Sequence, residues 1–213
     1  MSFRMNTSRL LLLSGLMTTA LLAAPISETF TGALDSEANT PGSVIVEPLV
    51  VTATSSVTLF TTSYGGGMNL NGTTTPAGGF QPNVTLFSST GFALAYENGQ
   101  YSPLNGTWDA YVTDTNLAAG SYFVIMTDQN NQVSASFTGF GGLAPSQFYT
   151  LFTGPGGNSY PDVDGNPRDA NYALNIQASP LASGAPEPAT FWLVIPALAG
   201  AAFFMRKRKL SLS

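Results

Sequence analysis

Cysteine and histidine are both missing from the 213-residue chain. Without them the protein has no disulfide, no thiolate nucleophile and no zinc site built on thiolate or imidazole. A Ser-His-Asp or Cys-His catalytic arrangement is excluded as well, because the base is absent. An exported protein need not contain cysteine, so this absence does not argue against export.

Charge is also scarce, and it is unevenly distributed. Charged residues make up 9 % of the chain, against about a quarter of a typical protein. Between residues 25 and 185 the only basic residue is Arg168. It stands against 11 acidic ones, a net charge of 1 − 11 = −10. Phosphate backbones are bound by Lys and Arg, so a nucleic-acid partner is excluded. The lack of lysine there also excludes Ser-Lys and Schiff-base catalysis.

The N-terminus has the layout of a secretory signal peptide. Arg4 and Arg9 form a basic start, a mostly apolar run extends from Leu10 to Leu22, and the small residues Ala23 and Ala24 follow. This order predicts a signal peptide over residues 1–24 that is handled by the Sec translocon and signal peptidase. The alternative interpretation is a buried N-terminal helix.

The C-terminus combines an uncharged run with a basic end. Residues 189–205 contain no charge, and Arg206, Lys207, Arg208 and Lys209 follow directly. At about 1.5 Å per residue the run makes a helix of roughly 25 Å, slightly short of a hydrocarbon core of about 30 Å. It predicts a transmembrane helix, and the positive-inside rule then places residues 25–185 outside the membrane.

The motif Pro186-Glu187-Pro188 stands directly before this run. The motif, the apolar segment with aromatic residues and the basic cluster together resemble the PEP-CTERM sorting signal of Gram-negative bacteria, here over residues 186–209. The resemblance implies processing by an exosortase, a transient inner-membrane anchor, and a final place at the cell surface or in a matrix with exopolysaccharide. A plain single-span anchor that is never cut is the alternative.

Residues 25–185 favour an all-β domain. Short runs rich in Val, Thr, Phe and Tyr alternate with Gly, Pro, Asn and Asp, which predicts about eight strands in an antiparallel β-sandwich or jelly roll. Thr90-Gly91 is a predicted hairpin turn, and Pro48 is expected to interrupt the first run. The expected strands lie within residues 43–54, 56–64, 83–89, 92–96, 108–114, 121–128, 132–138 and 171–178.

Two further segments bear on fold and family. Residues 65–83 are rich in Gly and polar side chains, and they are interpreted as a long, flexible surface loop. The phrases "AGGFQPNVTLFSSTGFALA", "LAAGSYFVIMTDQNN" and "DVDGNPRDANYALNI" resemble a β-rich family found with PEP-CTERM tails, which is similar to pre-peptidase C-terminal-like domains. The resemblance implies an accessory or adhesive β-sandwich without catalytic machinery. After Tyr96 the sequence departs from the family's aspartate-rich pattern.

One acidic loop carries a possible metal site. Asp162, Asp164, Asn166 and Asp169 alternate with a Gly in the turn, which resembles the first half of a calcium loop. The alternative is structural: Asp162 and Asp164 cap turns, and Asp169 pairs with Arg168 or another part of the fold. Arg168 is expected to bind a carboxylate at the edge of the last strand.

Aromatic residues offer a second kind of site. Tyr64, Tyr96, Tyr101, Trp108 and Tyr160 could stack against sugars if exposed, although aromatic residues in strands more often belong to the core. Three functions follow from the sequence. The first is a structural surface or matrix protein that is not an enzyme. The second is a carbohydrate- or Ca²⁺-binding adhesive module, and the third is a hydrolase with two carboxylates.

Overall fold

The structure is a computed structural model, and it describes residues 23–35, 40–97, 101–133, 137–153, 160–162 and 164–181. Apart from Ala23 and Ala24, the predicted signal peptide lies outside these residues, as does the whole predicted sorting signal at 186–209. Within the described part of the chain, no helix is long and apolar enough to cross a membrane.

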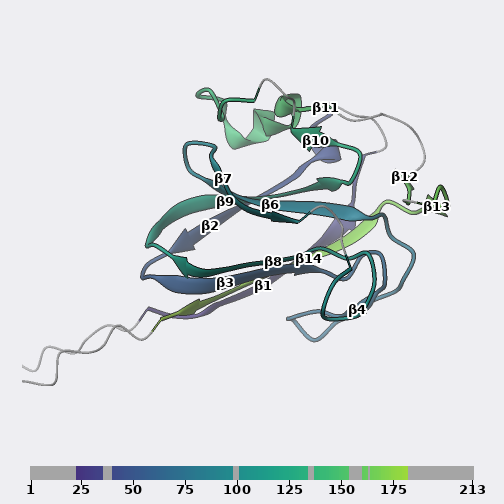
Figure 1. Cartoon of the computed structure of the whole chain (residues 1–213), viewed down its shortest axis with the longest axis horizontal. Helices are drawn as coiled ribbons and strands as arrows, with labels where there is room; N and C mark the ends of the chain where they lie inside the picture. The colour runs from purple at the N-terminus through teal and green to yellow at the C-terminus, as the bar shows by residue number, and fades with distance from the viewer. Residues whose placement is uncertain are drawn as a thin grey trace, which may run out of the picture.

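Two four-stranded antiparallel sheets pack face to face (Figure 1). Sheet A has the strand order β1 (Ile26–Ala33), β14 (Asn171–Pro180), β3 (Ser55–Thr61) and β8 (Tyr111–Leu117). Sheet B has the order β2 (Ile45–Val51), β9 (Gly120–Asp128), β6 (Pro82–Ser88) and β7 (Ala93–Glu97). The expectation of an all-β fold with antiparallel sheets packed as a sandwich is therefore confirmed.

Shorter elements connect and flank the sheets. Three two-stranded pairs are formed by β4 (Gly67–Met68) with β5 (Thr74–Thr75), β10 (Gln132–Val133) with β11 (Phe152–Thr153), and β12 (Tyr160–Pro161) with β13 (Pro167–Arg168). The 3-10 helices are η1 (Pro41–Ser43) and η2 (Pro145–Leu151). The β4 and β12–β13 elements lie at one end of the sandwich, and β10–β11 lies over sheet B (Figure 1).

The main core fills the space between the two sheets. Strand residues alternate between faces, so every second side chain of a strand points into this layer. Leu59 of β3 and Ile176 of β14 come from sheet A, and Val84, Leu86 and Val124 come from sheet B; all five are buried. The sandwich thus has the continuous apolar interior that a chain without disulfides needs for stability.

A second apolar cluster covers the outer face of sheet B. Phe87 of β6 and Ile125 of β9 point to this face, and Phe140, Phe148 and Phe152 pack onto them. The rings of Phe140 and Phe148 stack with centroids 3.9 Å apart and planes at 16°. The second half of β9, from Val124 to Asp128, is consequently buried on both faces, which explains its continuous apolar run.

The predicted strand over residues 132–138 is mostly wrong. Only Gln132–Val133 forms a strand, and it pairs with Phe152–Thr153 rather than with β9. Residues 137 and 138 are not in a strand, and residues 134–136 lie outside the described part. Phe140, Phe148 and Phe152 are instead buried on the outer face of sheet B, and Phe137 is partly buried there.

Two other local expectations need correction. Strand β1, which was not anticipated, pairs with β14 over its whole length, from Ile26–Ala178 to Ala33–Asn171. Pro48 does not interrupt the first run, because β2 is an edge strand that continues through it from Ile45 to Val51. An edge strand tolerates proline since one row of its backbone groups has no partner strand.

Residues 65–83 do not behave as a surface loop. The segment contains the β4–β5 hairpin, and Asn69, Phe80 and Gln81 are all buried. Gly79 has no room for a side chain, because a Cβ there would lie 2.4 Å from the carbonyl oxygen of Asn171. The glycines of this segment permit close backbone approach to sheet A.

The hairpin turn at Thr90-Gly91 is confirmed. Ser88 and Phe92 are joined by a backbone hydrogen bond of 2.8 Å, and Gly91 has a positive φ of 94°. A Cβ at Gly91 would meet the backbone nitrogen of Phe140 at 2.4 Å. The tip of the β6–β7 hairpin is therefore packed directly against the segment that covers sheet B.

Candidate functional site

The predicted calcium loop is a tight turn between β12 and β13. The Asp162 Oδ1 accepts hydrogen bonds from the backbone nitrogens of Asp164, at 3.0 Å, and Asn166, at 2.8 Å. Gly165 completes the turn with a φ of 81°. This is the turn-capping role that Asp side chains commonly play, and the alternative interpretation of Asp162 is confirmed.

The second oxygen of Asp162 binds a cation and a phenol. Its Oδ2 accepts hydrogen bonds from Nε of Arg168 at 3.0 Å, Nη2 of Arg168 at 2.8 Å and the hydroxyl of Tyr64 at 3.0 Å. The guanidinium also lies over the Tyr64 ring, with Cζ 3.8 Å from the centroid, and contacts the Tyr64 hydroxyl. The Asp162 side chain is fully buried in this cluster.

The protonation of Asp162 reflects these partners. Desolvation by burial would raise the pKa of this carboxyl, but the hydrogen bonds from Arg168, Asn166 and Tyr64 outweigh it and hold the pKa well below its usual range. The neighbouring Tyr64 has a raised pKa, because burial disfavours the phenolate and the Asp162 carboxylate accepts its proton in a hydrogen bond. The Asp162 side chain is thus a carboxylate at neutral pH.

The predicted calcium ligands are not assembled around a common point. Asn166 points its amide Nδ2 at Asp162, and Asp169 accepts a hydrogen bond from the backbone nitrogen of Asn171. Asp164 is exposed. Across the described residues, no group of three or more acidic side chains is arranged to hold a metal ion. The donors around Asp162 instead satisfy its charge within the fold.

A second buried carboxylate, Asp109, joins three segments, and its role was not foreseen from the sequence. Its Oδ1 accepts hydrogen bonds from the Thr61 hydroxyl and the Tyr64 backbone nitrogen, both at 2.9 Å. Its Oδ2 accepts from the Gly65 nitrogen at 2.9 Å and the side chains of Asn105, at 2.8 Å, and Thr107, at 3.0 Å. Asp109 therefore fixes the start of the 65–83 segment, with every donor supplied by the protein.

An asparagine network holds the β4–β5 hairpin against sheet A. The buried Asn175 accepts hydrogen bonds from the Thr29 hydroxyl at 2.8 Å and the Leu70 backbone nitrogen at 3.0 Å. Its Nδ2 donates to Asn69, whose oxygen also accepts from Thr62. The network links β1, β14, the residue directly after β3 and the hairpin, which explains why residues 65–83 pack into the fold.

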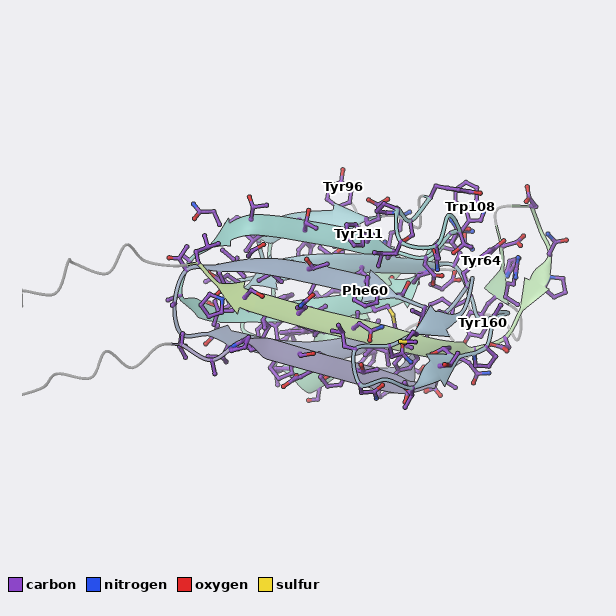
Figure 2. All side chains as sticks on the ribbon, turned by 90° about the horizontal axis from the view of Figure 1, so that it is seen from below. Phe60, Tyr64, Tyr96, Trp108, Tyr111 and Tyr160 are labelled. Carbon is purple, nitrogen blue, oxygen red and sulfur yellow. The ribbon has the colours of Figure 1, made fainter. Side chains whose placement is uncertain are left out.

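The five aromatic residues considered for sugar stacking have different environments, and Figure 2 labels all of them except Tyr101. Tyr160 is a core residue whose hydroxyl donates to the carbonyl of Leu34, and Tyr64 lies beneath Arg168. Trp108 is half-buried and packs edge-on against the exposed Tyr101, with centroids 5.9 Å apart. Tyr96 points away from the sandwich and is 67 % exposed.

Tyr96 belongs to the rim of a groove on the outer face of sheet B. The groove has a volume of about 370 Å³ and lies between the β6–β7 hairpin on one side and Gln132, Val133 and Phe137–Gly139 on the other. Phe92, at the hairpin, is as exposed as Tyr96. The polar side chains of the lining are Asn83, Thr85, Tyr96, Gln132 and Thr138.

Three described residues bury a side-chain oxygen without a hydrogen-bond partner, namely Asn83, Asp128 and Asn131. Asn83 lines the groove. Asp128 has a raised pKa, because desolvation by burial outweighs the hydrogen bonds from Asn130 and Gln129. Buried polar atoms without partners are uncommon, so each of these oxygens marks a place where the fold leaves a hydrogen-bond acceptor unused.

Comparison with known proteins adds no family assignment. No family model matches the chain, and a search of curated proteins finds no match.

Proposed function

We propose that the protein is an exported, non-enzymatic surface or extracellular-matrix protein of a Gram-negative bacterium. Its C-terminal segment 186–209 serves as a transient membrane anchor that an exosortase removes near Pro186-Glu187-Pro188. The Sec translocon and signal peptidase act at the N-terminus, and exopolysaccharide is the matrix partner. The sequence pattern at both ends motivates this proposal.

One observation of the fold supports it most directly. Strands β1 and β14 are antiparallel neighbours, and Ile26 pairs with Ala178. Residues 23–25 and Leu181 therefore attach to the same end of the sandwich. The Asp162 and Asp109 clusters lie towards the other end, near the Ala33–Asn171 pair. This geometry suits a domain that stands on a C-terminal anchor and presents its long loops away from the membrane.

The state of two buried carboxylates, Asp109 and Asp162, supports a non-enzymatic role. General acid–base chemistry needs a carboxyl that can reach a substrate and exchange a proton. Asp109 and Asp162 both accept hydrogen bonds from several groups of the fold, and Asp162 is additionally paired with Arg168. These two carboxylates hold loops together, which is the task expected in a domain that lacks disulfides.

Topology and processing can be tested separately in the source cell or in a host that carries an exosortase. An alkaline phosphatase fusion after Leu181 should be active, because the enzyme folds only outside the cytoplasm, and a fusion after Lys209 should be inactive. Replacing Pro186, Glu187 and Pro188 together with alanine should leave the tail attached and the protein in the membrane fraction. An inactive Leu181 fusion would contradict export, and normal release of the triple variant would contradict exosortase processing.

A further inference from the structure

We propose that the groove between the β6–β7 hairpin and the residues Gln132, Val133 and Phe137–Gly139 is a binding site for a neutral polysaccharide chain. The inference rests on the proposed function and deepens it, because it gives the polysaccharide partner a site on the domain and a chemical class. It depends on four features of the groove: an unpartnered polar side chain, exposed aromatic rings, a rigid frame and the absence of charge.

The unpartnered side chain is Asn83. It is 8 % exposed, it lines the groove, and its Oδ1 has no hydrogen-bond partner. It faces Thr127 across the β6–β9 pair, on the outer side of sheet B. An amide offers both an acceptor and two donors, which is the chemistry that a sugar hydroxyl requires. The Oδ1 atom itself is buried, so a ligand hydroxyl would meet this amide through the part of the side chain that lines the groove.

Two aromatic rings form the rim of the groove. Phe92 and Tyr96 are each 67 % exposed, and both line it. Tyr96 faces Thr85 across the β6–β7 pair, so its ring lies over the same face as Asn83. Exposed aromatic residues beside a concavity are typical of binding sites, and flat rings suit the apolar C–H faces of pyranose sugars.

The frame of the groove is formed before any ligand binds. The Gly91 turn contacts the backbone of Gly139 and Phe140 so closely that no side chain fits there. Phe87 packs against the rings of Phe137, at 5.8 Å between centroids, and Phe140, at 5.4 Å. A preformed site spends little free energy on ordering when it binds. The volume of about 370 Å³ is also within the range of about 300–1,000 Å³ typical of small-ligand sites.

The negative charge of the protein favours neutral glycans over acidic ones. Among the described residues, no acidic or basic side chain lines the groove. Residues 25–185 carry 11 acidic side chains against Arg168 alone, so the surrounding field repels uronic acids, sulfates and phosphates. The lining combines apolar rings with amides and hydroxyls, which matches an uncharged glycan with apolar faces and many hydroxyl groups.

The test uses the full-length chain, purified in detergent, on an array of neutral and acidic glycans. Isothermal titration calorimetry with the best neutral oligosaccharide then compares single variants. We expect neutral glycans to bind, and Phe92→Ala and Tyr96→Ala each to weaken binding about tenfold or more. Tyr101→Ala is the matched control, since Tyr101 is 69 % exposed but lies outside the groove lining. It should bind like the wild type.

Asn83→Ala separates binding from structure. The Asn83 oxygen has no partner in the fold. The variant should therefore unfold at a temperature no lower than the wild type while losing glycan binding. Binding of acidic glycans only, absence of binding to every neutral glycan, or undiminished binding by Phe92→Ala and Tyr96→Ala would overturn the proposal. Capture of an extended peptide that these variants also lose, without glycan binding, would overturn it too. The purified-protein readout does not depend on export or tail processing, so the two proposals fail independently.

Discussion

The guanidinium of Arg168 donates two hydrogen bonds to the buried Oδ2 of Asp162, at 2.8 and 3.0 Å. This is the only ion pair among the described residues. It closes the β12–β13 turn and covers the Tyr64 ring. Asp162, Arg168 and Tyr64 therefore form a structural cluster, which we call the Asp162 cluster.

The Asp162 cluster should make the folding stability fall at low pH. The pKa of Asp162 is lowered in the folded protein, so its contribution is present above the unfolded carboxyl pKa of about 3.9 and is lost as the pH falls through the lower folded pKa. Asp162→Asn should lower the thermal unfolding midpoint at pH 7 and flatten its dependence on pH below about 4. Thermal melts at a series of pH values measure this. The exposed Asp164→Asn serves as control and should leave the acid dependence of the wild type intact.

Calcium should have no effect on folding stability. The Asp162 carboxylate already has donors on both oxygens, and the neighbouring acidic side chains do not converge with it. Thermal melts in millimolar CaCl₂ and in EDTA should therefore coincide. A rise in the midpoint with calcium that Asp162→Asn abolishes would show that the turn rearranges to bind the ion.

Asp109→Ala should be strongly destabilising. Asp109 is buried, and its removal leaves donors from Thr61, Tyr64 and Gly65 without an acceptor. With about 1–3 kcal/mol for each unsatisfied buried group, we expect a loss of roughly 3–5 kcal/mol in the free energy of unfolding. Urea denaturation measures it. Asp114→Ala, which removes a single exposed hydrogen bond to Asn116, is the control. A loss below about 1 kcal/mol at Asp109 would contradict its structural role.

Asp128→Asn should stabilise the protein at neutral pH. Burial raises the pKa of Asp128, and its Oδ2 has no partner. A raised folded pKa means that stability is greatest below the unfolded pKa and falls as the pH rises through the folded one. The asparagine removes this loss and can still accept the hydrogen bond from the Asn130 nitrogen. Its melting temperature should exceed that of the wild type at pH 7, and the difference should vanish towards pH 4. An equal difference at both pH values would point to another cause.

The strands that carry a strong apolar alternation could be predicted from the sequence. Residues 83–89 and 171–178 both fall on central strands, with Val84 and Ile176 in the core. Strand β1 was missed because "ISETFTGA" is mostly polar and half-exposed, and it becomes a strand only through its pairing with β14. Its conformation is imposed by tertiary contact, which no local pattern encodes.

The sites depend even more on distant contacts. The local turn-capping role of Asp162 could be anticipated, because an Asp beside a Gly turn binds its own backbone. The acceptor role of Asp109 could not, since its partners at Thr61 and Tyr64 lie 48 and 45 residues away. The groove likewise combines Asn83, Tyr96 and Thr138 from three segments. Only the folded arrangement shows that Tyr96 is open while Tyr160 is buried.

The intact mass of the mature protein, released from the surface of the source cell, tests the central claim of export and tail removal most directly. The account predicts a chain that begins close to Pro25 and ends near Pro186, so that Arg206, Lys207, Arg208 and Lys209 are absent. A mature surface protein that retains this basic cluster, or a chain that keeps its first 24 residues, would contradict it.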